Sequence, residues 1–392
     1  MKALSQELLA DRTFDIEFHG YLTNHVKHAI VALDRLGASE ARIQEYWDMY
    51  TFSTPYHIPL HKVENPWEAV TPASPEDWEE WKGRKLGWQQ LVKFLEEQHR
   101  SNEELVKDYA PGLLGGIAGA LTHGIIHLGW AVDAGSPWMV KEGLAYLNFC
   151  YLPAAPVKSK AIEESDATTS LLRVAKEVHE KNLRESWIEF AKSKYDEGFH
   201  PELVEAGFQW RLAAVLKEAH PVATDIPSWV REKPLDDVFE ELYRIVGLLY
   251  LATRSSAGDG NFIVLHLLTS LWGLEKVCEV IAQEETSRDA LEGFWEVAIS
   301  TANALSCGFP THQVLQSALD QYPLDCADTT AFDWSGVVEL ARAEEEEHNI
   351  KLVYVARELW RKYDRWIGFS ESAKSFTVTP RISSGSAASS AN

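Results

Sequence analysis

The chain has 392 residues, enough for two or three domains or one large one, and its 45% hydrophobic and 24% charged residues are typical of a folded globular protein. Its formal net charge of −22, from 37 basic and 59 acidic residues, argues against nucleic acids and anionic membrane surfaces as partners. No segment reaches the apolar length of a signal peptide or a membrane span, so we expect a cytoplasmic protein.

Helical periodicity dominates the chain and alternating strand patterns are scarce, so we predict an all-α fold. The first helix is expected to begin near Tyr21 and to end at Gly37, and Ser39 is expected to cap the second. The prolines over 52–76 predict an extended loop, after which helical spacing resumes over 77–100. Further helical patterns follow at 111–132, 136–152, 171–189, 238–252, 262–281, 291–305 and 334–366.

We predict that these helices form one large domain over residues 1–375, with a metal site between its core helices. A repeat with a period of about 30 to 45 residues, which would indicate a solenoid, is not found. Residues 376–392 are rich in serine and other small residues, which predicts a flexible C-terminal tail.

Histidine is the unusual residue of this chain, because several of its 14 copies lie in apolar helical segments. These are His25 and His28, His123 and His127, His266, and His348. Spacings of three and four residues place the members of each pair on one face of a helix. A buried imidazole needs a partner, and a metal ion held between facing helices would satisfy all of them together. The alternative is that each histidine is hydrogen-bonded separately in the core.

Imidazoles without thiolates suit iron, zinc, copper or manganese, and oxygen-activating iron typically adds a carboxylate. The acidic run 344–347 is expected to be a solvated face in a first helical turn rather than a ligand. Lys351 offers another source of oxygen, because a buried neutral lysine can take up CO2 to form a carbamate. The alternative for Lys351 is a surface ammonium paired with Glu347 one turn earlier.

Several other enzyme classes lack support. A GxSxG nucleophile elbow, a P-loop and a complete GxGxxG after a strand are all missing from the sequence. Aromatic residues make up 11% of the chain and include 15 tryptophans. Most are expected to fill the core, and some could stack on a flat aromatic ligand.

Several short strings give the chain a recognisable pattern. They are GYLTNHVKHA at 20–29, LGAS at 36–39, HGIIHLG at 123–129, EGLAY at 142–146, HLLTS at 266–270, and His348 followed by Lys351. In this order they resemble the questin oxidase-like family of fungal aromatic polyketide oxidation. The resemblance spans roughly residues 15–365, and its specificity lies in the order of the four histidine-containing segments.

The resemblance implies an oxygenase of secondary metabolism that uses O2 to open a ring of an anthraquinone or related polycyclic aromatic polyketide. Opening would proceed by dioxygenase carbon–carbon cleavage or by Baeyer–Villiger-type oxygen insertion. The implied cofactor is Fe(II), and NADPH use stays open. The implied metal ligands are His28, His127, His266, His348 and carboxylated Lys351, with His25, His123 and Asn24 as alternative ligands or supporting groups. The exact substrate and the oligomeric state are not implied.

Two other functions stay open at this point. The first is an NADPH-dependent Baeyer–Villiger monooxygenase without a bound metal. The second is a non-catalytic helical protein that binds aromatic metabolites, with its histidines satisfied by hydrogen bonds. Bound metal distinguishes both from the iron enzyme.

Overall fold

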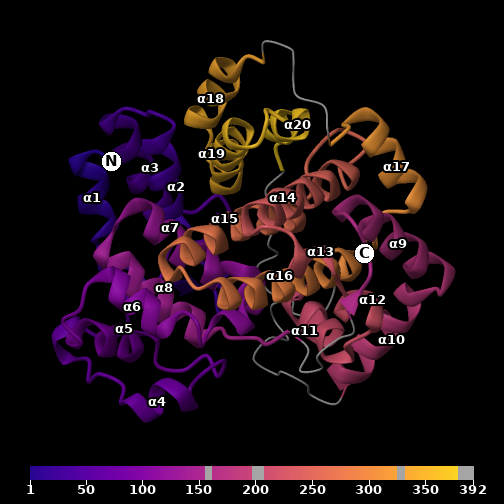
Figure 1. Ribbon diagram of the computed structural model, residues 1–392. Coiled ribbons are helices and arrows are strands. Elements are labelled where there is room, and N and C mark those ends of the chain that lie inside the picture. The colour runs from indigo at the N-terminus through magenta and orange to yellow at the C-terminus, as the bar shows by residue number, and fades with distance from the viewer. Residues whose placement is uncertain (155–160, 197–206, 325–331, 378–392) are drawn as a thin grey trace.

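The computed structural model describes residues 1–154, 161–196, 207–324 and 332–377. Within these ranges almost all regular structure is α-helical (Figure 1), which confirms the predicted all-α class. The sheets are minimal: β1 (Glu17–Phe18) pairs antiparallel with β2 (Leu22–Thr23), and β3 (Ala161–Ile162) pairs parallel with β4 (Ile226–Pro227). No helix of the described part is long and apolar enough to span a membrane.

The N-terminal half contributes eight α-helices and three 3-10 turns to the part of the chain described. They are α1 (Ala3–Leu9), α2 (Val26–Arg35), α3 (Glu40–Phe52), η1 (Trp67–Ala69), α4 (Pro75–Glu80), α5 (Trp88–Glu97), α6 (Asn102–Tyr109), η2 (Leu114–Gly116), η3 (Gly119–Thr122), α7 (His123–Ala134) and α8 (Pro137–Phe149). Ser39 caps α3 as predicted, accepting the backbone N–H of Arg42. The predicted loop over 52–76 contains only the single turn η1 before α4 begins.

The C-terminal half contains twelve further helices in its described residues. They are α9 (Ala167–Glu180), α10 (Leu183–Asp196), α11 (Phe208–Glu218), α12 (Pro221–Thr224), α13 (Trp229–Glu232), α14 (Leu235–Ala252), α15 (Phe262–Ile281), α16 (Glu284–Ala304), α17 (His312–Gln321), α18 (Trp334–Ala343), α19 (Glu347–Lys362) and α20 (Ile367–Lys374). The predicted tail lies outside the described residues from position 378 onward.

Several predicted helices are wrong in their bounds. The spacing over 77–100 forms two helices, α4 and α5, and that over 171–189 is divided between α9 and α10. Three further differences have a local cause. The first predicted helix begins at Val26 rather than near Tyr21, because 22–23 pairs as β2 and Asn24 Oδ1 accepts the N–H of Val26. The glycine-rich stretch before His123 forms the turns η2 and η3 instead of helix, since glycine is a poor helix former. The long helix over 334–366 is divided into α18 and α19 by extended backbone at Glu344 and Glu346.

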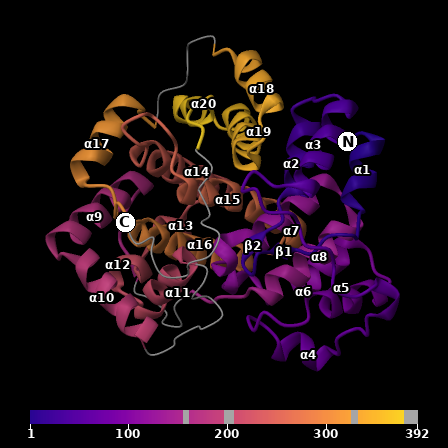
Figure 2. The same ribbon diagram turned by 180° about the vertical axis from the view of Figure 1, so that it is seen from behind.

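Helix α15 lies near the centre of the molecule, with α7 and α19 packed beside it (Figures 1 and 2). Helix α7 packs against α8 and α15, and α19 packs against α2 and α15. The approach of α7 to α15 is set by glycine: a Cβ added to Gly129 would lie 2.1 Å from the Cα of Gly273. One continuous hydrophobic core extends from α1 to α20. It surrounds these helices, so polar groups on their inner faces are removed from water.

Candidate metal centre

Four segments that are distant in sequence bring their histidines together in this core. Helix α2 contributes His25 as its N-cap and His28, and α7 contributes His123 and His127. Helix α15 contributes His266, and α19 contributes His348. All six side chains are buried. The predicted convergence of the four histidine-containing segments is therefore present in the fold.

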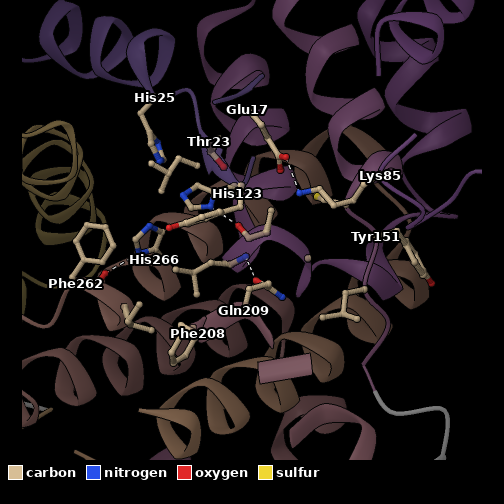
Figure 3. A pocket seen from close by; sticks show the side chains of 18 of the residues that line it. Glu17, Thr23, His25, Lys85, His123, Tyr151, Phe208, Gln209, Phe262 and His266 are labelled. Atoms are coloured by element: carbon tan, nitrogen blue, oxygen red, sulfur yellow. Dashed lines mark hydrogen bonds and ion pairs between the residues drawn. The ribbon is translucent and has the colours of Figure 1, made fainter. Parts of the chain in front are cut away.

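Four of these imidazoles form a closed cluster, which we call the four-histidine cluster: His25, His123, His266 and His348. One ring nitrogen from each lies within 4.8 Å of the others. Around the cluster, successive ring centroids are separated by 4.6 Å, 4.8 Å, 4.8 Å and 4.7 Å. Figure 3 shows three of these histidines turned toward one another at one side of a pocket. This spacing is short enough for one metal ion to contact all four rings.

Three of the four rings are fixed from outside through Nδ1. The Nδ1–H of His266 donates to the Phe262 carbonyl at 2.8 Å, and that of His123 donates to the Ala120 carbonyl. His348 places Nδ1 2.6 Å from Glu346 Oε1. This arrangement points Nε2 of each ring toward the middle of the cluster. It is typical of metal-binding histidines, which bind the ion through one ring nitrogen and donate the N–H of the other to a carbonyl or carboxylate.

The inner nitrogens have few partners in the described protein. His266 Nε2 lies 3.1 Å from His348 Nε2, and two neutral rings both protonated at Nδ1 would oppose lone pairs there. His123 Nε2 is buried without any hydrogen-bond partner among the described residues. A buried polar atom without a partner costs free energy, and a metal ion would satisfy these nitrogens together. The residues present therefore fit a metal ion.

Lys351 lies beside the cluster and is fully buried, with its Nζ 3.0 Å from His25 Nδ1. Burial lowers the pKa of Lys351 to about 8, against the opposing influence of nearby Glu347 and Glu346. The alternative expectation of a surface lysine is wrong, because α19 turns this residue toward α2 in the core. A larger share of Lys351 is thus neutral near pH 7 than for an exposed lysine.

The other member of each histidine pair lies behind the cluster. His28 Nδ1 is 3.1 Å from His25 Nδ1, and His28 Nε2 is 3.0 Å from His127 Nδ1. His127 Nε2 in turn lies 3.4 Å from Glu142 Oε2, which also accepts hydrogen bonds from Lys27 at 2.7 Å. The contacts from His25 through His28 and His127 thus end at the buried ion pair of Glu142 and Lys27. His28 and His127 therefore lie on the side of His25 that faces away from the four-histidine cluster.

Of the five expected ligands, His28 and His127 lie outside the four-histidine cluster, and the other three lie in it or against it. His266 and His348 belong to the four-histidine cluster, and Lys351 contacts it. The cluster also contains His25 and His123, which the sequence offered only as alternatives. Asn24 uses its side chain to accept the N–H of Val26 at the start of α2 and to donate to the Asp15 carbonyl. Its contacts are those of a supporting group.

Two glutamates that were expected to be solvated are buried beside His348. Glu346 accepts from the His348 ring and caps α19, whereas Glu347 Oε1 accepts from Tyr50 at 3.2 Å and Tyr56 at 3.3 Å. Burial, followed by the negative charge of Glu346, raises the pKa of Glu347 well above its ordinary value. The expectation of a solvated face is wrong for these two residues, because the extended backbone before α19 turns them inward.

A pocket opens onto the four-histidine cluster, with a cavity of about 180 Å³. Its aromatic lining residues are Tyr21, Tyr56, Tyr151, Phe208 and Phe262. Across the pocket from His266, the Lys85 ammonium and the Glu17 carboxylate form an ion pair of 2.7 Å (Figure 3). Glu17 also accepts from Tyr146 at 2.9 Å. The pocket therefore combines flat apolar walls with a donor and an acceptor opposite the histidines.

The buried histidines predict that the metal-free protein loses stability in acid. Burial lowers the pKa of six imidazoles, namely those of His25, His28, His123, His127, His266 and His348. In the unfolded chain these groups take up protons near their ordinary pKa, so their stabilising effect is present above about pH 6.5 and is lost as the pH falls. Each contributes up to about 1.4 kcal/mol per pH unit.

The check is urea unfolding of metal-free protein at about pH 7 and about pH 5.5. We expect a markedly smaller free energy of unfolding at the lower pH. Equal values would contradict the burial of neutral imidazoles.

One comparison with known protein families matches most of the chain. The model of the questin oxidase-like family matches residues 22–356, which include every histidine of the centre and Lys351. No curated protein matches the chain. The chain thus belongs to the questin oxidase-like family, and this membership supports an oxygenase that acts on anthraquinone-type aromatic substrates.

Proposed function

We propose that the protein is a non-heme iron oxygenase that opens a ring of an anthraquinone or related polycyclic aromatic polyketide. The observation that carries the proposal is the four-histidine cluster at the inner side of an aromatic pocket. Pockets that bind small molecules are lined mainly by apolar and aromatic side chains, with a few convergent polar groups, and this pocket has that composition. Bound Fe(II) would supply the activation of O2.

We assign His25, His123, His266 and His348 as the protein's nitrogen ligands. Lys351 is assigned as the source of an oxygen ligand, because its buried Nζ contacts His25. Its neutral amine would add CO2, forming a nitrogen–carbon bond and releasing one proton, to give a carbamate with two oxygens. A histidine set with one added carboxylate is typical of oxygen-activating iron. His28 and His127 then support the ligands from behind.

The remaining pocket residues bind and orient the substrate. The aromatic walls suit a planar polycycle, and Glu17 can accept a hydrogen bond from a phenolic hydroxyl while Lys85 donates to a quinone carbonyl or phenolate. The substrate would also close the pocket and exclude water from the histidines. The protein thereby supplies geometry and a dry cavity.

The first test is elemental analysis of protein purified without chelators or a His tag, followed by oxygen uptake with hydroxyanthraquinones. We expect near-stoichiometric iron and uptake that a chelator abolishes. Oxygen uptake by metal-free protein that requires NADPH would replace the proposal with the nicotinamide-dependent monooxygenase. Binding of anthraquinones with neither metal nor oxygen uptake would indicate the non-catalytic function.

Labelling with 18O2 separates the two ring-opening chemistries. Dioxygenase cleavage places both oxygen atoms of O2 in the product and needs no external electrons. Baeyer–Villiger insertion places one atom in the product and reduces the other to water, so it consumes two electrons from a donor such as NADPH. A product with two labelled atoms should therefore form without NADPH, whereas a product with one labelled atom should require an electron donor such as NADPH.

Gln209 is predicted to hold His123 in the position for binding metal. Residues 120–122, just before this histidine, have positive φ angles of 47°, 51° and 65°, a conformation that costs about 1–2 kcal/mol for each non-glycine residue. Gln209 spans this loop: its Oε1 accepts the N–H of Leu121, and its Nε2 donates to the Ala118 carbonyl at 3.1 Å. Gln209→Leu is expected to weaken metal binding about tenfold, measured by titration with Fe(II) under nitrogen.

Gln89 provides the matched control, because its buried amide makes the same two backbone contacts to Asn65 in another loop. Both variants should lose about 1–3 kcal/mol of stability from unsatisfied backbone groups. Only Gln209→Leu should also lose metal affinity. Equal metal affinities in the two variants would reduce Gln209 to a purely structural residue.

A further inference from the structure

Three aromatic side chains continue from the metal centre along the helices that build it. Trp130 follows His127 by three residues on α7, and Tyr354 follows Lys351 by three on α19. Trp272 follows His266 by six residues on α15. A spacing of three residues keeps Trp130 and Tyr354 on the same side of their helices as the preceding group, whereas six residues turn Trp272 about 120° away from His266. The ring contacts, rather than the spacings alone, show that Trp272 joins the other two.

These rings are in successive contact. The Trp130 ring centroid lies 6.0 Å from that of His28 and 5.6 Å from that of Tyr354. Tyr354 lies 5.8 Å from Trp272. All three separations are those of directly packed aromatic pairs. One unbroken row of rings thus extends from the histidines behind the four-histidine cluster to Trp272.

The row ends at a shallow depression on the protein surface. Tyr354 and Trp272 line it together with Arg35, Asp133, Lys276, Arg357, Glu358 and Arg361. The Lys276 ammonium lies 4.8 Å from the centroid of the Trp272 ring. The four cationic side chains of the depression outnumber its two carboxylates and Glu279, which pairs with Lys276 at 2.8 Å, so the depression carries a small local positive charge although the whole chain carries −22. Close to the surface, within the screening distance of about 8–10 Å, this excess favours a small anion.

The hydrogen bonds of the row suit the transfer of single electrons. A tyrosine loses an electron far more readily when its proton can leave, and the Tyr354 hydroxyl donates to Asp133 Oδ2 at 2.8 Å. Trp130 differs, because its buried Nε1–H finds no acceptor among the described residues. Oxidised Trp130 would therefore keep its proton and take an electron from Tyr354. The row therefore has a transmitting ring near the centre and a proton-coupled ring near the surface.

We propose that Trp130, Tyr354 and Trp272 form an electron relay between the metal centre and an anionic one-electron reductant, of the ascorbate class, at the surface depression. The electron acceptor is an oxidised metal centre, so this part rests on the proposed function. Trp130 would give one electron to the bound metal and would recover it from Tyr354 as the phenolic proton moves to Asp133. The surface reductant returns one electron through Trp272, and the proton returns from Asp133 to the phenol.

One experiment tests the outer half of the relay without any metal. Metal-free protein is mixed with hexachloroiridate(IV), an anionic one-electron oxidant, and frozen rapidly for electron paramagnetic resonance. We expect a dominant tyrosyl signal that disappears in Tyr354→Phe and is strongly reduced in Trp272→Phe. Trp130→Phe should keep it, because Trp130 lies beyond Tyr354. A signal unaffected by Tyr354→Phe or by Trp272→Phe overturns the proposal.

A second experiment starts from the other end. Iron-loaded protein is treated with hydrogen peroxide in the absence of an aromatic substrate, and the same signal is recorded. Here Trp130→Phe and Tyr354→Phe should both abolish it, whereas Trp272→Phe should retain it and slow its decay on addition of ascorbate. Retention of the signal in Trp130→Phe overturns the inner half of the relay. Failure to bind iron overturns the proposed function and leaves the first experiment decisive for the outer half.

Two control variants separate the relay from general packing. Tyr243 is buried and donates to Glu275 at 2.8 Å, and Trp295 is buried against Trp229. Tyr243→Phe and Trp295→Phe remove the same atoms as the relay variants from other parts of the core. Both should leave the two signals unchanged. A loss of signal in either control would assign the effect to altered packing and overturn the relay.

Discussion

His123→Ala is expected to abolish iron binding and oxygen uptake, whereas His127→Ala, one helical turn away, is expected to retain both at a reduced level. His123 belongs to the four-histidine cluster and directs an unpartnered Nε2 inward. His127 contacts His28 and lies near Glu142 instead. Loss of a ligand should weaken metal binding by more than about 100-fold, and loss of a supporting histidine by about tenfold. Anaerobic Fe(II) titration and iron content per chain measure both.

The same comparison applies on α2, where His25→Ala should resemble His123→Ala and His28→Ala should resemble His127→Ala. Each pair shares one helix end, so differences in expression or folding are matched. If His28→Ala and His127→Ala lose iron while the other two retain it, the ligand set implied by the family resemblance would hold, and our assignment would be wrong.

The sequence predicted that the histidine-containing segments converge but not which ring of each pair faces the centre. On α7 both histidines share one face. His123 is turned inward because residues 120–122, directly before it, have left-handed backbone conformations. On α2 the helix begins one residue after His25, so this ring follows the geometry of a cap rather than of a helical face. Helical periodicity carries no information about either feature.

The pocket was less predictable than the metal centre. Glu17 comes from the short strand β1, Lys85 from a loop before α5, and Gln209 from α11, and none of them lies in a distinctive motif. The burial of Glu346 and Glu347 was also missed, because an acidic run normally indicates a solvated surface. The available signal was their position directly before His348, where a carboxylate can fix the ring and cap the helix. Tertiary packing, rather than local pattern, brought these residues together.

Gly129→Ala is expected to destabilise the protein by about 3 kcal/mol and to lower its iron content, although the change adds only one methyl group. The new Cβ would lie 2.1 Å from the Cα and 2.2 Å from the carbonyl oxygen of Gly273, and backbone atoms cannot rotate away. Helices α7 and α15 must therefore separate, which moves His123 away from His266.

The matched substitution is Gly293→Ala on α16, where an added Cβ meets no atom within 4 Å. It should stabilise the protein by about 0.5–1 kcal/mol, because alanine loses less backbone entropy than glycine in a helix, and it should leave iron binding unchanged. Urea unfolding with iron analysis of both variants makes the comparison. The two substitutions are chemically identical, so any difference must come from their surroundings. Opposite changes in the free energy of unfolding, with iron loss only in Gly129→Ala, would identify the α7–α15 contact as the feature that sets the spacing of the histidines. If Gly129→Ala were as stable as the unmodified chain, these helices could not approach as closely as described, and the four-histidine cluster would lose its structural basis.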